Sequence, residues 1–200
     1  MKKIAFIPAR SGSTRIKNKN LQKINDKPLI YWSVYHAIKS SRFDEIIFSS
    51  DSEYYYKVLI RYLKKNNINS KNLIFDKRST KHTKKKSKIF DYIKSDLIKK
   101  FNLKDEDLLV LLLPTCPLRS LKTLQKIIDY ATLIKKNCFT ANEYNFHLSF
   151  GFSLQKKSWK PLYKYSPMLT GNTQSQNQKK FYYPNPFANC MFIKNIKKSN

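Results

Sequence analysis

Residues 4–21 read Ile4-Ala5-Phe6-Ile7-Pro8-Ala9-Arg10-Ser11-Gly12-Ser13-Thr14-Arg15-Ile16-Lys17-Asn18-Lys19-Asn20-Leu21. A short apolar run ends at a proline, and a loop of small residues that also carries four cations follows it. Small residues let backbone N–H groups approach an anion closely, and several cations in one loop neutralise more than one phosphate. The spacing matches neither the dinucleotide fingerprint nor the P-loop. The stretch by itself therefore leaves two interpretations, a different phosphate-binding loop or a basic turn after an edge strand.

Two further segments place short polar motifs directly after apolar runs. Residues 108–113 read Leu-Leu-Val-Leu-Leu-Leu, which is typical of a strand buried on both faces of a parallel sheet. The run continues into Pro114-Thr115-Cys116-Pro117-Leu118-Arg119-Ser120. A shorter run, Ile46-Ile47-Phe48, continues into Ser49-Ser50-Asp51-Ser52.

These segments resemble, in order and spacing, the motifs of the CMP-sialic acid synthetase (acylneuraminate cytidylyltransferase) family. That family has a strand followed by Ala-Arg, a Gly/Ser loop and Lys-Asn, then a strand ending in Ser-Thr-Asp-Ser, then Pro-Thr-Ser-Pro-Leu-Arg. A later segment, Tyr183-Pro184-Asn185 followed by residues 188–193, is similar to the family's Arg-Pro-Asn-Gly-Ala-Ile-Tyr strand. Here Tyr replaces Arg and two residues are inserted. The resemblance covers roughly residues 3–193.

Strand and helix patterns alternate along the first two thirds of the chain. Strands are predicted at residues 4–7, 45–49, 72–75, 108–113 and 138–141, with helices at 28–38, 55–63, 90–101 and 124–131. Such alternation favours a mostly parallel sheet covered on both faces, an α/β fold with three layers. The length of 200 residues fits a single domain over residues 1–200. The resemblance implies a Rossmann-like fold of the nucleotide-diphospho-sugar transferase type.

The pattern changes after about residue 143. Residues 147–152 alternate weakly, and residues 170–180 are rich in Asn and Gln, which predicts an excursion or flexible loop. The resemblance implies that a segment at about residues 144–182 is a protruding arm exchanged with a second subunit. We therefore expect a homodimer.

The chain carries 40 Lys and Arg residues against 13 acidic residues, a net charge of +27. Nucleic-acid binding is one explanation. The cations are scattered, however, and the densest run, at residues 77–88, is typical of a solvated loop, so we expect no nucleic-acid partner. A positive field also helps recruit CTP and an acidic sugar. No apolar run reaches the ~20 residues of a membrane span, and Cys116, Cys138 and Cys190 lack metal-site spacing. We expect a cytoplasmic protein without a signal peptide.

The resemblance implies transfer of CMP from CTP to an acidic nine-carbon sugar, an N-acylneuraminate or related nonulosonic acid, with release of pyrophosphate. It assigns Arg10 and Lys19 to the triphosphate as catalytic cations and the backbone of Ser11, Gly12 and Ser13 to the phosphates. Asn20 matches an asparagine beside the cytidine. Further candidates are Arg15 for phosphate, Arg78 for the nucleotide, and Arg119 and Asn185 for the sugar. The alternatives for Arg78 and Arg119 are a solvated cation and a structural hydrogen bond, respectively.

The family's Mg²⁺ is bound by an Asp-x-Asp motif after the strand that matches residues 188–193. Residues 196–200 contain no carboxylate, so we expect that metal site to be missing and turnover to be impaired. Asp51, at the end of a predicted strand, is a weak candidate metal ligand with strand capping as its alternative. Leu113 stands where the family has a glutamine. Two other functions stay open: a different sugar nucleotidyltransferase, and a nucleotide-binding homologue that does not turn over.

Overall fold

Residues 1–13, 16–83 and 87–198 are described by the computed structural model, which divides into two units. The larger unit comprises Met1–Thr140 and Pro186–Asn200, and the smaller unit comprises Ala141–Asn185. The smaller unit includes the segment at about residues 144–182 that the sequence predicted as an arm. Its exchange with a second subunit stays a prediction.

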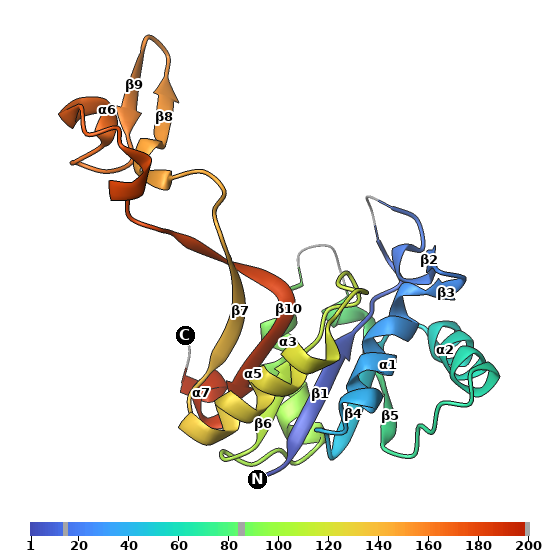
Figure 1. The fold of residues 1–200 in the computed structure, drawn as a ribbon. Coiled ribbons are helices and arrows are strands. Elements are labelled where there is room, and N and C mark those ends of the chain that lie inside the picture. Colours follow the sequence, from blue (N-terminus) through green and yellow to red (C-terminus); the bar gives the residue numbers. More distant parts are fainter. Residues whose placement is uncertain (14–15, 84–86, 199–200) are drawn as a thin grey trace. The chain divides into compact units, whose positions relative to one another are not determined.

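A six-stranded sheet in the order β5-β4-β1-β6-β10-β7 forms the centre of the larger unit (Figure 1). Its strands are β1 (Lys3–Pro8), β4 (Glu45–Ser50), β5 (Leu73–Lys77), β6 (Leu108–Leu111), β7 (Cys138–Glu143) and β10 (Tyr182–Phe192), of which β7 ends and β10 begins in the residues of the smaller unit. Strands β5, β4, β1 and β6 are parallel, and β10 pairs antiparallel with β6. The predicted mostly parallel sheet is therefore confirmed.

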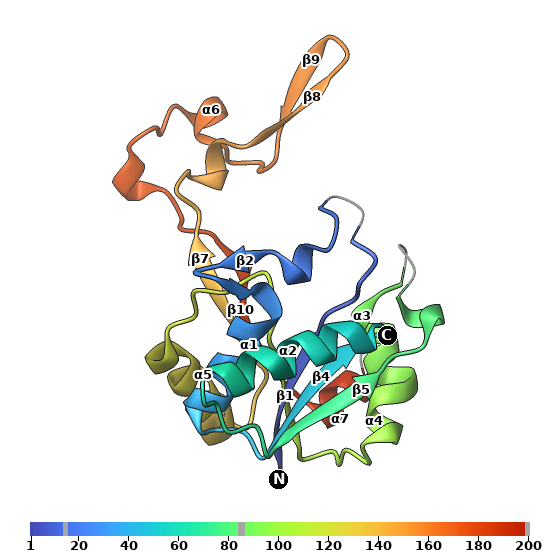
Figure 2. The same cartoon turned by 90° about the vertical axis from the view of Figure 1, so that its right-hand side faces the viewer.

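Helices cover both faces of this sheet (Figure 2). One face packs against α1 (Leu29–Ser40), α2 (Glu53–Lys65) and α5 (Leu121–Ile134). The other packs against α3 (Ile89–Tyr92), the π-helical turn η3 (Ile93–Leu97), α4 (Ile98–Lys100) and α7 (Ile193–Lys198). The run at residues 108–112 is buried throughout, with alternate side chains in the two cores, as its continuous apolar character predicted.

Local sequence signals set the ends of several elements. Pro28 directly precedes α1, and the hydroxyls of Ser52 and Ser120 cap α2 and α5 by accepting from the N–H of the third residue on. Between β1 and α1 lie η1 (Lys19–Leu21) and a hairpin of β2 (Lys23–Ile24) and β3 (Lys27–Pro28). Its turn residues, Asn25 and Asp26, both have positive φ, which these residue types tolerate. The 3-10 turn η2 (Thr80–His82) follows β5.

The smaller unit has almost no core of its own. It contains η4 (Leu148–Phe150), the antiparallel pair β8 (Phe152–Gln155) and β9 (Ser158–Pro161), α6 (Pro167–Thr170) and η5 (Ser175–Asn177). Among its described side chains only Ser166 and Pro167 are buried. The stretch at residues 170–180 includes η5 and is tied together by the Gln178 amide, which donates to the Asn172 carbonyl at 2.7 Å. Across both units, no described helix combines the length and apolar character needed to cross a membrane.

Candidate nucleotide-binding site

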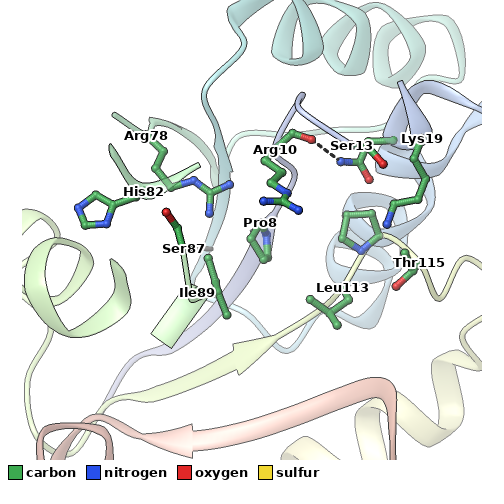
Figure 3. A pocket seen from close by; sticks show the side chains of 12 residues that line it. Pro8, Arg10, Ser13, Lys19, Arg78, His82, Ser87, Ile89, Leu113 and Thr115 are labelled. Carbon is green, nitrogen blue, oxygen red and sulfur yellow. Dashed lines mark hydrogen bonds between the residues drawn. The ribbon is translucent and has the colours of Figure 1, made fainter. Parts of the chain in front are cut away.

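A pocket of about 290 Å³ opens at the carboxyl ends of the parallel strands (Figure 3). Its lining residues are Pro8, Arg10, Ser13, Lys19, Asn20, Arg78, His82, Ser87, Ile89, Leu113, Pro114 and Thr115. β4 and β5 are added on one side of β1 and β6 on the other, so the strand order reverses between β1 and β6. In open α/β sheets, ligands bind at this reversal, outside the carboxyl ends of the strands.

The described residues that line the pocket include three fixed cations and no carboxylate. Figure 3 shows the guanidinium group of Arg10 between Arg78 and Lys19. Burial is the largest cause that lowers the pKa of Arg78; the charges of Asp51 and Asp76 raise it, and the like charge of Arg10 adds to the lowering. An anion of two or more charges would compensate the three cations of the pocket, and the pocket therefore favours a phosphate ligand.

Arg78 has a buried guanidinium group that is short of acceptors. Its backbone N–H donates to Ser50 O at 2.9 Å, which extends the β4–β5 pairing. The side chain is only 5% exposed, and within the described part of the chain its Nε has no hydrogen-bond partner. Burial is the main cause that lowers the Arg78 pKa. The alternative of a solvated cation is therefore wrong, and a buried N–H without an acceptor indicates a place for a ligand oxygen.

The loop that carries Arg10 is held at several points. The Ser50 hydroxyl donates to Ala9 O at 2.7 Å, and the Asn20 amide donates to Arg10 O at 2.9 Å. Arg10 Nη1 reaches Thr83 O at 3.4 Å. Asn20 is buried and holds the loop through this bond, and its predicted place beside the cytidine stays a prediction. These bonds fix the direction in which the Arg10 side chain leaves the loop.

The backbone of residues 11–13 differs from the predicted phosphate-binding arrangement. The Ser11 N–H donates to Asp51 Oδ1 and the Ser13 N–H to Ser11 O, both at 2.8 Å, so neither is directed at an anion in this conformation. A Cβ added at Gly12 would meet no atom within 4 Å, which leaves room for a close approach. The predicted phosphate contact of Arg15 lies outside the described residues.

Asp51 uses its carboxylate within the loop. Oδ1 accepts from the Ser11 N–H and Oδ2 from the Ser11 hydroxyl, each at 2.8 Å. Among the described residues, no group of three or more His, Cys, Asp or Glu side chains is arranged to hold a metal ion. Mg²⁺ can also be held by one or two carboxylates together with ligand phosphates, and Asp51 as a metal ligand stays an untested prediction.

Arg119 does not have a free donor for the predicted sugar contact. Its five N–H groups all donate to protein acceptors: Ser33 Oγ and the carbonyls of Leu113, Cys116, Pro186 and Phe187. The side chain is only 4% exposed, and burial lowers its pKa to about 10. No donor is left for a sugar, so Arg119 makes structural hydrogen bonds, which was the alternative interpretation. Arg119 fixes the turn after β6 that brings Leu113, Pro114 and Thr115 to the pocket.

Asn185 belongs to the smaller unit. Its amide donates to Asn142 Oδ1 at 2.7 Å, within the same unit. Its predicted sugar contact stays a prediction.

Sequence reasoning missed His82, Ser87, Ile89 and Thr115 as lining residues. The first two lie in the basic run at residues 77–88, which was interpreted as a solvated loop. The available signal was position, because this run directly follows a parallel strand and its first residues must lie at the ligand-binding edge of the sheet. The sequence also did not predict that Asp76 and Tyr92 are buried beside Arg78.

Comparison with known proteins gives consistent relatives. The family described as "Cytidylyltransferase" matches residues 4–132. An N-acylneuraminate cytidylyltransferase of Escherichia coli O18:K1:H7 is 34% identical over 136 residues, 68% of this chain and 30% of that protein. A CMP-N,N'-diacetyllegionaminic acid synthase of Legionella pneumophila is 33% identical over 132 residues, 64% of this chain and 53% of that protein. The matched segments thus span 30% and 53% of these relatives' lengths.

Among solved structures, the CMP:2-keto-3-deoxy-manno-octonic acid synthetase complexed with CTP superposes with a TM-score of 0.65. The alignment covers 99% of this chain and 76% of that chain at 12% identity. At this identity the likeness concerns the fold alone. It agrees with the three-layer architecture described above.

Proposed function

The chain belongs to the cytidylyltransferase family, and from this premise we propose that it binds CTP in the pocket between β1 and β6 and transfers CMP to an acidic sugar. The acceptor is an N-acylneuraminate or a related nonulosonic acid, and pyrophosphate is the second product. The names of the Escherichia coli and Legionella pneumophila relatives support this class of acceptor.

The observation that carries the proposal is the charge of the pocket. Arg10, Lys19 and Arg78 lie around one space of about 290 Å³, and no described lining residue is acidic. A triphosphate carries several negative charges that need compensation at short range. A neutral ligand in this pocket would leave the three cations without a counter-charge, and this cost disfavours its binding.

The reaction is a displacement at the α-phosphorus of CTP. The sugar hydroxyl oxygen forms a bond to the α-phosphorus, and the bond from that phosphorus to the bridging oxygen breaks. Pyrophosphate leaves with the electron pair, and the hydroxyl proton passes to solvent. Arg10 and Lys19 are the catalytic residues in this proposal, because they stabilise the negative charge that develops on the leaving oxygens.

Mg²⁺ accompanies CTP in the proposal, since a divalent ion neutralises phosphate charge and orients a leaving group. No step above is assigned to it. The roles given to Arg10, Lys19 and Arg78 depend on their own charge and hydrogen-bond donors.

We also include a homodimer in the proposal. The smaller unit exposes large apolar side chains, among them Leu154 at 83% and Phe146 at 62%. Because that unit has hardly any buried side chains of its own, contact with a second copy would remove this surface from water.

Pyrophosphate release tests the function directly. The chain is incubated with CTP, Mg²⁺ and, in separate reactions, N-acetylneuraminate, a diacetyllegionaminate and an uncharged hexose. Release is expected with a nonulosonic acid and not with the hexose. Loss of release in Lys19→Ala but not in Lys17→Ala, an exposed neighbour outside the pocket, would tie it to this site. CTP binding without release with any acid would leave a nucleotide-binding homologue instead.

A further inference from the structure

Arg78 and Arg119 are buried to the same degree but are stabilised in opposite ways. Arg119 spends all five N–H groups on protein acceptors. Arg78 instead places its guanidinium carbon 5.5 Å from the centre of the Tyr92 ring, and its Nε has no partner in the described part of the chain. An aromatic face attracts a cation without consuming its in-plane N–H donors. Arg78 therefore keeps both its charge and its donors for a ligand, whereas a carboxylate in the place of Tyr92 would have taken both.

Tyr92 is itself held firmly. Its side chain is 3% exposed, and its ring lies 6.4 Å from Phe6 in a stacked arrangement and 5.1 Å from the ring of His82. Its hydroxyl donates to Asp76 Oδ2 at 2.6 Å. The ring thus has neighbours from β1, η2 and β5, and its face cannot turn away from Arg78 without breaking these contacts.

Asp76 anchors this arrangement. Its carboxylate is completely buried and accepts from three donors: Tyr92 at 2.6 Å, the Ser49 hydroxyl at 2.6 Å, and Lys100 Nζ at 2.5 Å. A buried carboxylate is stable only when it is paired and hydrogen-bonded, and this one satisfies both conditions without involving Arg78. Asp76 and Arg78 are two residues apart, so their side chains leave the same side of the strand. The acid is near Arg78 but is neutralised by Lys100.

From these contacts we infer that Tyr92 is a positioning residue, which holds the Arg78 guanidinium at the pocket wall with its donors directed to a phosphate group. The inference rests on the proposed function in that the phosphate belongs to CTP. Within it, Asp76 and the rings of Phe6 and His82 together hold the Tyr92 ring, Tyr92 fixes Arg78, and Arg78 contacts the anion.

Titration with CTP and, separately, with inorganic tripolyphosphate tests the inference. Tyr92→Phe keeps the ring and should bind both anions within about threefold of the wild type, with lower thermal stability. Tyr92→Leu removes the aromatic face and should bind both roughly 3- to 30-fold more weakly. Tyr92→Met, which fills the space with a flexible chain, serves if Tyr92→Leu does not fold. Phe48→Leu is the matched control, because Phe48 is buried in the other core and does not line the pocket.

An Arg78→Ala background separates positioning from general loosening of the fold. If Tyr92 acts through Arg78, Tyr92→Leu should cause no further loss of affinity in that background, although it lowers thermal stability equally in both. An equal loss of affinity in both backgrounds, or unchanged affinity in folded Tyr92→Leu, overturns the inference. Binding of tripolyphosphate but not of CTP would contradict the proposed function. The effect of Tyr92 on anion affinity could still be measured with tripolyphosphate. Failure of the wild type to bind either anion would overturn both.

Discussion

Asp51 holds Ser11 through both oxygens of its carboxylate, which accept from the Ser11 N–H and hydroxyl at 2.8 Å each. Ser11 follows β1 and Asp51 follows β4, two strands that pair in parallel. The contact therefore joins the loops at the carboxyl ends of neighbouring strands, at the residue that directly follows Arg10. This geometry accounts for Asp51 as an organiser of the loop.

Asp51→Asn and Asp51→Ala should differ in their effect. Asn retains an oxygen that accepts from the Ser11 N–H, so we expect a loss of less than about 1 kcal/mol in the free energy of unfolding. Ala removes both bonds and should cost about 1.5–3 kcal/mol, the scale of hydrogen bonds to a charged group. Urea denaturation measures both. CTP titration of Asp51→Asn with and without Mg²⁺ is the control, and a loss of affinity only in the presence of Mg²⁺ would show a metal ligand instead.

Arg10→Ala and Lys19→Ala should each weaken CTP binding by about 1.5–3 kcal/mol, because each removes a charge-assisted contact to the triphosphate. Isothermal calorimetry measures the change. Lys17→Ala removes an equal charge from the same loop at an exposed position outside the pocket and should leave the affinity nearly unchanged. Equal losses in all three variants would indicate a diffuse effect of net charge, and no loss in Arg10→Ala and Lys19→Ala would exclude the pocket as the CTP site.

The fold could be predicted from the sequence because its strands carry strong signals. The apolar run at residues 108–113 predicted a strand buried on both faces, and it contains β6, an inner strand of the sheet between β1 and β10. The helical period at residues 55–63 predicted α2 in the same way. These patterns reflect burial, which acts on every residue of an element, so they survive local exceptions.

The site could be predicted only in part, because its side chains depend on contacts distant in sequence. Arg78 lies in a run of basic residues and looks solvated from the sequence, but the fold buries it beside Tyr92 of α3. The opposite error occurred at Arg119, where proximity to a ligand site suggested an anion contact. Two of its acceptors, the carbonyls of Leu113 and Cys116, are local, but the others lie on α1 and β10, far along the chain, and no local pattern predicts them.

Arg119→Lys should lower the free energy of unfolding by about 2–4 kcal/mol, because one ammonium group cannot replace five N–H donors and buried carbonyls lose their partners. Urea denaturation measures this loss. Arg42→Lys is the control, since Arg42 makes a bidentate pair with Asp129 at the surface and should change stability by less than about 1 kcal/mol. Similar small losses in the two variants would contradict the structural role of Arg119.

His36 should make stability depend on pH below neutrality. Its ring is buried in α1 with Nδ1 donating to Trp32 O at 2.6 Å, and burial, helped by the charge of Arg119, lowers its pKa below the ordinary 6.5. The unfolded chain then takes up a proton before the folded one does. The contribution to stability is therefore full above about pH 6.5 and falls as the pH drops, by up to about 1.4 kcal/mol per unit.

Denaturation of wild type and His36→Gln between pH 7.5 and 5 checks this sign. The two curves of free energy against pH should converge toward low pH, because only the wild type carries the penalty of charging a buried imidazole. His147→Gln, at a partly exposed position of the smaller unit, is the matched control. Curves for wild type and His36→Gln that stay parallel throughout this range would contradict the expectation.

The exposed apolar side chains of the smaller unit should mediate a homodimer. Sedimentation equilibrium at about 10–50 μM, where a dissociation constant in the micromolar range would be visible, is expected to show a dimer. Leu154→Glu should raise the dissociation constant about tenfold or more, because a buried Leu contributes about 1.5–3 kcal/mol and a buried carboxylate costs more.

Leu133→Glu is the matched control for Leu154→Glu, since Leu133 on α5 is 79% exposed and Leu154 is 83% exposed. Because each substitution lowers the net charge of +27 by one, reduced repulsion would favour association in both variants equally. Dissociation in Leu154→Glu alone would therefore assign the interface to the smaller unit, whereas a wild-type monomer throughout this range would exclude the dimer.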